Sequence, residues 1–262
     1  MTKALAAFLF GLVRLLTAPL GRWRRLTVLA RLHDRLAPVA ECDVRGLGVR
    51  FLTPDRTAVY WPRHGYASEP GTLDWLDGLG PGDVLYDIGA NVGAYTVYAA
   101  KKTGARVVAF EPSPASFHVL VRNLALNGVA GQVTPLCLAL ADTTGPAAIG
   151  LGDLNAGSVG HGLGADTAFT LNTLSLRLDD AVGLLGLPAP SHVKLDVDGL
   201  EPPILAGAAA VLAGPALRAV LVEYRPHGAE ARARIDELLT AAGLRLAAEA
   251  EDNRIYVRSE SN

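Results

Sequence analysis

Cysteine is scarce in this chain, and its scarcity excludes two kinds of architecture. Only Cys42 and Cys137 occur among 262 residues. Two thiols cannot make a disulfide framework, and their spacing matches no metal site. Cys137 lies in an apolar run, where we expect a buried core thiol. This usage favours a reducing compartment, so we expect a cytoplasmic protein.

Low-complexity runs, internal repeats, a strong net charge and long uncharged apolar runs are also missing. The net charge is −2 and the pI is about 6.3, which argues against nucleic acid as a main partner. The N-terminal uncharged run, residues 4–13, is far too short for a transmembrane helix. Arg14 interrupts the apolar stretch that a signal peptide would need. The length suits one α/β domain plus an appendage.

The first 40 residues differ in charge from the rest of the chain. They hold one acid, Asp34, and seven basic side chains, a net charge of +6: Lys3, Arg14, Arg22, Arg24, Arg25, Arg31 and Arg35. Apolar residues follow helical spacing on both sides of Pro19-Leu20-Gly21. We therefore expect a basic amphipathic helical extension over 1–40 and a single domain over 41–262. The extension either caps that domain or a second subunit, or lies on an anionic membrane.

The most informative segment is residues 83–93, Asp-Val-Leu-Tyr-Asp-Ile-Gly-Ala-Asn-Val-Gly. Its apolar run has the character of a parallel strand buried on both faces. Gly89 and Gly93 then allow a sharp turn and the approach of a ligand to the backbone. A helix that begins near residue 94 offers free N–H groups. The next apolar run ends at Glu111, 22 positions after Gly89, where an acid accepts ribose hydroxyls. This order predicts a nucleotide-type cofactor.

The spacing of the glycines selects among such cofactors. A dinucleotide usually needs G-x-G-x-x-G for its pyrophosphate, whereas Gly89 and Gly93 leave only G-x-x-x-G. Asp87 precedes the loop, where it would repel a pyrophosphate but could bind an amino group near a sulfonium. The loop therefore favours S-adenosylmethionine. An NAD(P)-dependent oxidoreductase and a catalytically silent cofactor-binding scaffold stay as alternatives.

Several motifs in the same order resemble the FkbM family of S-adenosylmethionine-dependent methyltransferases. They lie between about residue 66 and residue 226 and include 87–96, 109–114, 123–127, 140–142, 178–180 and 193–201. One departure is Asp198, where many relatives carry Glu. The resemblance implies O-methylation of a hydroxyl on a sugar, a glycolipid or a secondary metabolite, and a small-molecule or glycan acceptor as partner.

The alternation of apolar runs with helical periodicity predicts a doubly wound, mostly parallel sheet in an α/β domain. We expect strands near 49–52, 57–61, 84–88, 106–111, 133–138, 192–196, 217–223, 244–249 and 253–258. We expect helices near 70–78, 94–102, 114–127, 178–185, 200–212 and 229–242. A tight turn at Asp252-Asn253 predicts an antiparallel last strand, which the resemblance identifies as the class I methyltransferase (Rossmann-like) ending.

The predicted cofactor contacts follow the first two strands of the nucleotide unit. Glu111 should hold the ribose, and Asp142 should lie near the adenine. The full set is Asp87, Gly89, Ala90, Asn91, Gly93, Glu111, Pro112 and Asp142.

The segment from residue 149 to residue 173 is too rich in glycine for a simple connection. It is either a flap that faces the acceptor or an exposed hairpin. The resemblance implies a polar Asn-x-Gly-Ser stretch here, so Asn155 and Ser158 are candidate acceptor contacts without a definite role.

The segment from Lys194 to Gly199 is the predicted chemical centre. Lys194, Asp196 and Asp198 would share one face of a strand, with Lys194 and Asp198 as acceptor contacts. An alcohol needs a base during methyl transfer. Asp196 is the first candidate, and Glu223 and His227 follow. The acids could instead form a structural ion-pair network or hold Mg²⁺, although their spacing is not diagnostic of a metal site.

Overall fold

The computed structural model describes residues 1–151, 153–158, 162–163, 169–224 and 228–258. The chain divides into two compact units, Met1–Pro38 and Val39–Asn262.

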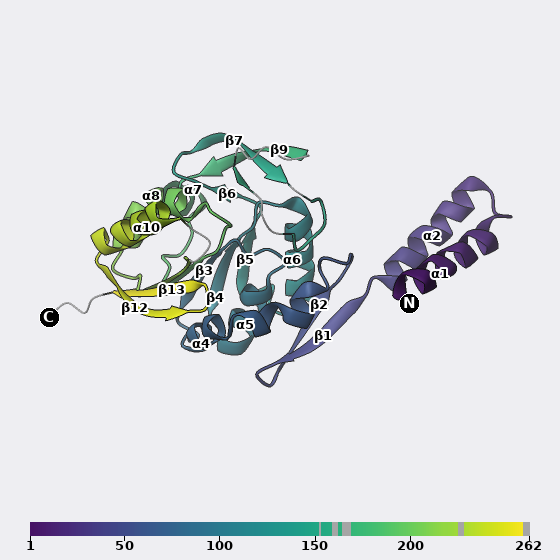
Figure 1. Cartoon of the computed structure of the whole chain (residues 1–262), viewed down its shortest axis with the longest axis horizontal. Helices are drawn as coiled ribbons and strands as arrows, with labels where there is room; N and C mark the ends of the chain where they lie inside the picture. Colours follow the sequence, from purple (N-terminus) through teal and green to yellow (C-terminus); the bar gives the residue numbers. More distant parts are fainter. Residues whose placement is uncertain (152, 159–161, 164–168, 225–227, 259–262) are drawn as a thin grey trace. The chain divides into compact units, whose positions relative to one another are not determined.

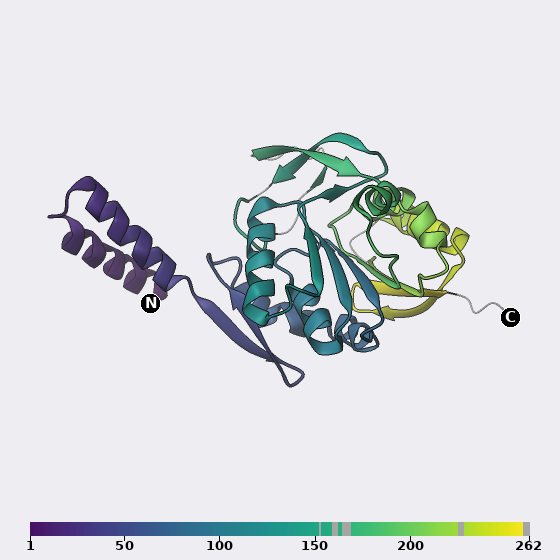
Figure 2. The same ribbon diagram turned by 180° about the vertical axis from the view of Figure 1, so that it is seen from behind.

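The smaller unit is a helical hairpin. Helices α1 (Thr2–Thr17) and α2 (Arg22–Leu36) lie side by side (Figures 1 and 2). Pro19 and Gly21 separate them, since proline and glycine are poor helix formers. Over the described part of the chain, no helix combines the length and the hydropathy needed to cross a bilayer.

The larger unit is built on a seven-stranded sheet. Its strand order is β12-β13-β11-β10-β3-β4-β5. The strands are β3 (Val84–Ile88), β4 (Arg106–Phe110), β5 (Val133–Leu136), β10 (His192–Leu195), β11 (Ala219–Glu223), β12 (Leu244–Ala250) and β13 (Asn253–Arg258). The first five of these run parallel, whereas β13 pairs antiparallel with both β11 and β12. The predicted doubly wound sheet with an antiparallel last strand is therefore confirmed.

Two layers of helices cover the sheet, because alternate residues of each strand point to opposite faces. Leu85 of β3 belongs to the core beneath α4 (Pro70–Asp77), α5 (Ala94–Thr103) and α6 (Pro114–Asn127). Tyr86 and Ile88 belong to the core beneath α7 (Leu178–Leu185), α8 (Glu201–Ala206), α9 (Ala209–Ala213) and α10 (Ala229–Ala241). Figures 1 and 2 show the two layers on either side of the sheet. Asp87 thus points to the α5 side.

The described part of this unit also contains two smaller sheets. Strands β1 (Val39–Val44) and β2 (Leu47–Leu52) form an antiparallel hairpin. The second small sheet has the order β6-β9-β7-β8, with β6 (Ala139–Leu140), β7 (Gly145–Leu151), β8 (Gly162–Leu163) and β9 (Phe169–Leu176). Strand β7 pairs antiparallel over its whole length with residues 169–175 of β9. The glycine-rich segment is therefore carried by a hairpin.

The strand predicted at 57–61 was wrong. The Asp55 carboxylate accepts the backbone N–H groups of Thr57 and Ala58, each at 2.9 Å, and these bonds turn the chain. The π-helix η1 (Trp61–Gly65) and the short helix α3 (Tyr66–Ser68) follow.

The helix predicted at 200–212 is two helices, α8 and α9. It breaks at Gly207, where a Cβ atom would collide with the carbonyl of Ala141. Cys137 was also predicted wrongly, because this thiol is exposed. Strand β5 ends at Leu136, so Cys137 lies beyond the sheet.

Candidate functional site

The turn after β3 is shaped by left-handed backbone. Gly89, Asn91 and Gly93 have φ values of 84°, 49° and 84°. The N–H groups of Gly89 and Ala90 both donate to the carbonyl of Phe110 at 3.0 Å. These bonds tie the turn to the end of β4, directly beside Glu111.

The two glycines are required by the protein's own packing. A Cβ atom on Gly89 would collide with the carbonyl oxygen of Asp196, and one on Gly93 would collide with the side chain of Leu120. From the sequence, we expected both glycines to allow a sharp turn and the approach of a ligand to the backbone; their left-handed φ values fit the turn. In the structure, the end of β10 and helix α6 fill the space beside them.

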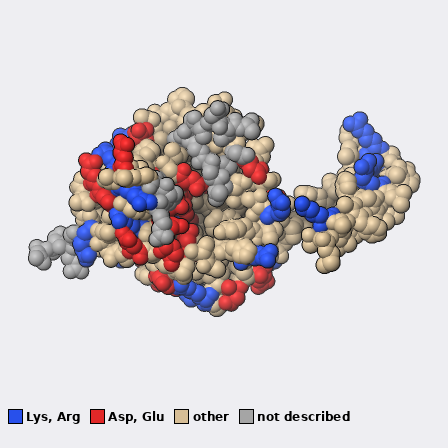
Figure 3. All heavy atoms as spheres, in the orientation of Figure 1, with Lys and Arg blue, Asp and Glu red and all other residues tan. Residues whose placement is uncertain are grey.

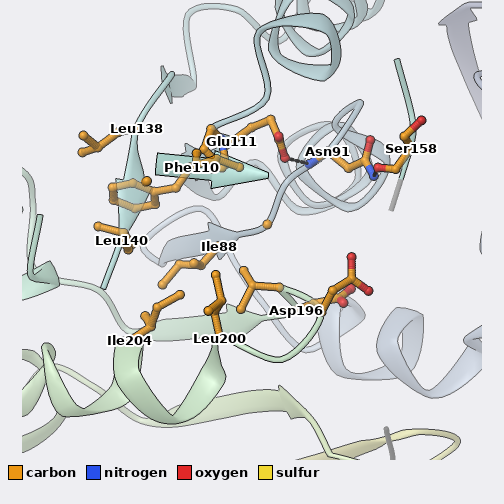
Figure 4. Close-up of a pocket in the computed structure, with 16 residues that line it drawn as sticks. Ile88, Asn91, Phe110, Glu111, Leu138, Leu140, Ser158, Asp196, Leu200 and Ile204 are labelled. Atoms are coloured by element: carbon orange, nitrogen blue, oxygen red, sulfur yellow. Dashed lines mark hydrogen bonds between the residues drawn. The ribbon is translucent and has the colours of Figure 1, made fainter. Parts of the chain in front are cut away.

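A cavity opens at the carboxyl edge of the sheet, where β3, β4 and β10 end. Its wall consists of Ile88, Gly89, Asn91, Phe110, Glu111, Pro112, Leu138, Ala139, Leu140, Ile149, Ser158, Asp196, Val197, Asp198, Leu200 and Ile204. Figure 4 shows apolar side chains such as Leu138 and Leu140 at one end and the polar groups of Asn91, Ser158 and Asp196 at the other. The cavity therefore suits a ligand with one apolar part and one polar part.

Glu111 lies on the cavity wall with a side chain that is almost fully buried. The residue is 6% exposed. Its carboxylate accepts the N–H groups of Asn91 and Ser113, both at 2.8 Å. Burial raises the pKa of Glu111 to about 7, although the two N–H groups favour the ionised form. Each carboxylate oxygen has further acceptor capacity, so this group could accept a vicinal diol.

Asp87 and Lys194 lie side by side beneath the cavity. They are register partners in the parallel pair of β3 and β10, and both are 1% exposed. Thr96 donates its hydroxyl to Asp87 Oδ2, whereas Asp87 Oδ1 has no hydrogen-bond partner among the described residues. Burial raises the pKa of Asp87, and the positive charge of Lys194 opposes that rise.

Asp196 stands between this buried pair and the cavity. Lys194 Nζ lies 2.7 Å from Asp196 Oδ2, and the Asp196 side chain is 25% exposed. Burial opposes the charge of Lys194, but the carboxylates of Asp196, Asp87 and Glu69 raise its pKa overall. The lysine also lies 4.8 Å from the centre of the Tyr95 ring. Lys194 is therefore a group beneath the site and does not line the cavity.

Glu223 ends β11, next to β10 in the sheet. Burial raises the pKa of Glu223 to about 8, and the nearby carboxylate of Asp196 adds to that rise. Glu223 Oε2 is buried and has no hydrogen-bond partner in the described part of the chain. A carboxyl group that titrates near neutral pH is suited to proton transfer.

Asp198 was expected to share a strand face with Asp196, but β10 ends at Leu195. Asp198 instead has a left-handed φ of 52° and reaches the cavity wall from a turn. Glu201 holds this turn: its carboxylate accepts the N–H groups of Val197 and Gly199 at 2.9 and 3.0 Å. Glu201 was not among the predicted site residues, although an acid in the first turn of a helix is a recognisable capping signal.

The hairpin contributes one polar group to the wall. Asn91 Nδ2 donates to the carbonyl of Ser158 at 3.2 Å, and the N–H of Gly157 donates to Ser116 Oγ at 3.1 Å. These bonds place Ser158 at the cavity. Asn155 is exposed, and its N–H and amide group bond to Asp153.

Asp142 and Gly93 were also predicted at the site, but neither lines the cavity. Asp142 is exposed and does not belong to the cavity wall. Gly93 is the N-cap residue of α5. His227 lies outside the described residues. Nor do the described residues contain a group of three His, Cys, Asp or Glu side chains arranged to hold a metal ion, so the Mg²⁺ alternative gains no support from geometry.

The apolar half of the wall was not predicted from the sequence; it consists of Leu138, Leu140, Leu200 and Ile204. A signal was available for the first two. They follow β5, and residues just beyond the carboxyl ends of parallel strands line the crevice in doubly wound sheets.

Residues 87–246 match the family model described as the methyltransferase FkbM domain. The chain belongs to the FkbM methyltransferase family. The family predicted from the motifs, with its S-adenosylmethionine-dependent methyltransferase character, is thereby confirmed. This membership counts against the NAD(P)-dependent oxidoreductase.

Two curated relatives align with the chain over part of their length. Hexuronic acid methyltransferase AglP of Haloferax volcanii is 31% identical over 165 residues, which cover 63% of this chain and 66% of the relative. The 31-O-demethyl-FK506 methyltransferase FkbM of Streptomyces tacrolimicus is 30% identical over 159 residues, which cover 49% of this chain and 60% of the relative. The chain thus spans about two thirds or less of these relatives.

Solved structures resemble the chain more distantly. A methyltransferase FkbM from Methylobacillus flagellatus KT has a TM-score of 0.45 and 17% identity, over 68% of this chain and 44% of the other. Magnesium protoporphyrin IX methyltransferase ChlM from Synechocystis PCC 6803, solved with bound S-adenosylmethionine, has a TM-score of 0.47 and 16% identity, over 78% and 85% of the two chains.

Proposed function

We propose that this chain transfers a methyl group from S-adenosylmethionine to a hydroxyl on a sugar, a glycolipid or a similar secondary metabolite. One observation carries the proposal. The buried carboxylate of Glu111 borders a cavity that is apolar at one end and polar at the other. S-adenosylmethionine has the same division, with a flat adenine, a ribose diol and a charged amino-acid end.

The wall residues fit the three parts of this cofactor. Phe110, Leu138 and Leu140 would enclose the adenine, and Glu111 would accept the ribose hydroxyls. Asn91 Oδ1 is buried and has no hydrogen-bond partner among the described residues. Because Asn91 Nδ2 already donates to the hairpin, this oxygen is left as an acceptor for the ammonium group.

When bound, S-adenosylmethionine would supply an activated methyl group on a positively charged sulfur. The chain's own residues must align the acceptor oxygen and take its proton during transfer. We propose Asp196 as this base, because it lies on the cavity wall and Lys194 holds its carboxylate in place. Glu223 is the second candidate, since its unpaired oxygen and raised pKa suit a proton acceptor.

The names of the two curated relatives support the acceptor class. One names hexuronic acid, which is a sugar acid, and the other names an O-demethylated compound. We also propose a cytoplasmic location, which accords with the two free cysteines of the structure.

Calorimetry with S-adenosylhomocysteine tests the cofactor. We expect Glu111→Gln to weaken binding by about 10- to 100-fold, because charge-assisted hydrogen bonds are worth about 1.5–3 kcal/mol. Glu237→Gln is the matched control, since this side chain is 66% exposed. A wild type that binds NADH or NADPH but not S-adenosylhomocysteine would support the oxidoreductase instead.

Mass spectrometry of cell extracts incubated with methyl-labelled cofactor tests the reaction. The wild type should label a hydroxyl-bearing acceptor, whereas a silent scaffold would label none. Asp196→Asn should bind S-adenosylhomocysteine normally and lose about 100-fold or more in transfer rate. If Asp196→Asn transfers as fast as the wild type and Glu223→Gln does not, then Glu223 is the base.

A further inference from the structure

The helical hairpin Met1–Pro38 has almost no core of its own. Thr17 is its single buried side chain, and the Thr17 hydroxyl donates to the carbonyl of Val13 within the same helix. A unit of this size cannot be stable through so little burial. Its helices therefore require a surface that covers them.

Helix α1 is apolar around most of its circumference. Lys3 and Arg14 are its only charged residues. Its large apolar side chains are exposed by 41–71%: Leu5, Phe8, Leu9, Phe10, Leu12, Leu15 and Leu16. The two helices thus do not bury these side chains against each other. A helix that is apolar on most sides is normally buried in protein or in lipid.

Helix α2 adds the positive charge. Arg22, Arg24, Arg25, Arg31 and Arg35 lie on it, against a single acid, Asp34. On the face seen in Figure 3, the hairpin displays basic and uncharged side chains.

Two basic side chains of the hairpin lie over aromatic rings. The Arg22 guanidinium is 5.3 Å from the Trp23 ring, and that of Arg14 is 5.9 Å from the Phe10 ring. Trp23 is 74% exposed. Tryptophan beside arginine is typical of the boundary between lipid headgroups and acyl chains.

We propose that Met1–Pro38 docks on an anionic lipid bilayer, with the apolar side chains of α1 at the acyl boundary and the arginines of α2 at the phosphates. The 16 residues of α1 extend about 24 Å, less than the roughly 30 Å of a bilayer core. The helix therefore lies in the plane of the membrane.

Other occupants fit the same surface less well. The core of a protein interface is depleted of charge, whereas this hairpin concentrates it. Nucleic acid would neutralise the arginines but would leave the phenylalanines and leucines of α1 exposed. An anionic membrane satisfies both features. The docking does not depend on the proposed methyl transfer, although it would bring the enzyme to lipid-linked acceptors.

Flotation of the full-length protein with vesicles tests the docking. One set of vesicles is pure phosphatidylcholine, and the other contains about 30% phosphatidylglycerol. We expect flotation with the anionic vesicles at low salt and loss of flotation near 0.5 M salt. The variant Arg24→Glu/Arg31→Glu/Arg35→Glu should bind at least about 100-fold more weakly, since each basic residue contributes about fivefold.

The matched control is Arg106→Glu/Arg122→Glu/Arg245→Glu, which makes the same charge change at exposed positions of the larger unit. This control should float like the wild type, and calorimetry with S-adenosylhomocysteine should show that both variants are folded. The proposal is overturned if the wild type stays in the soluble fraction at low salt, or if both triple variants lose binding equally. Concentration-dependent dimerisation without flotation would also overturn it and would assign the hairpin to a second copy of the chain.

Discussion

Lys194 and Asp196 form an ion pair that crosses from the core to the cavity, with Nζ 2.7 Å from Oδ2. The lysine is buried beside Asp87 and Tyr95, while the aspartate reaches the wall. The buried cation of Lys194 thus offsets the negative charge of two carboxylates, Asp87 in the core and Asp196 at the cavity. Because Lys194 is buried and does not line the cavity, we propose that it positions Asp196.

Lys194→Met should destabilise the protein by about 3–5 kcal/mol, because it leaves the buried charge of Asp87 uncompensated. Urea unfolding measures this change in the free energy of unfolding. Lys102→Met, at an exposed position, should change it by less than about 0.5 kcal/mol. Adding Asp87→Asn to Lys194→Met should restore part of the loss. If Lys194→Met and Lys102→Met have the same free energy of unfolding, then Lys194 does not stabilise the buried charge of Asp87.

Gly89→Ala should destabilise the protein more than a Gly→Ala change that causes backbone strain without a steric clash. Gly128→Ala is the comparison, because its φ of 71° is also left-handed but no atom lies near its added Cβ. We expect about 1 kcal/mol for Gly128→Ala and at least about 3 kcal/mol for Gly89→Ala, whose Cβ would meet the carbonyl of Asp196. Urea unfolding compares the two. If both variants lose a similar amount of unfolding free energy, then the backbone at Asp196 can move away from the added Cβ atom at little cost.

Binding of S-adenosylhomocysteine should strengthen as the pH rises from about 5.5 to 8. Burial raises the pKa of Glu111 to about 7, so the protonated form predominates at lower pH. A ribose diol donates to the ionised form, and affinity should therefore change by up to about tenfold per pH unit below 7. Calorimetry across this range should show a flat profile for Glu111→Gln. A wild type with a flat profile would exclude a titrating Glu111 from the ribose contact.

The free energy of unfolding of the wild type should fall as the pH rises, and it should fall less in the Glu223→Gln variant. Burial raises the pKa of Glu223 to about 8 in the folded protein, well above its usual 4.5. The folded state therefore favours the protonated form of Glu223. The contribution of this group to the free energy of unfolding is full below about pH 4.5 and is lost as the pH rises through 8. Urea unfolding at pH 5, 6.5 and 8 should give a shallower decline for Glu223→Gln than for the wild type. Glu237→Gln should keep the wild-type decline, and three equal declines would contradict the raised pKa.

Elements with strong local signals were predictable from the sequence. Strand β3 and helix α6 begin and end at the predicted residues. A continuous apolar run defines the strand, while Pro114 and Gly128 bound the helix. The strand expected at 57–61 failed because the Asp55 side chain turns the chain there, a contact that alternation of apolar residues cannot reveal.

By itself, the sequence determined the order of strands and helices, the family, and the acids that end the strands, because these depend on local pattern and short spacings. Glu111 was predictable in this way. Only the tertiary structure decided which charged residues face the cavity. Asp142 and Lys194 come from motifs as distinct as that of Glu111, yet one is exposed and the other is buried. The reason is that the orientation of a side chain at the sheet edge depends on strand register and on the helix that covers each face, and distant parts of the chain supply both.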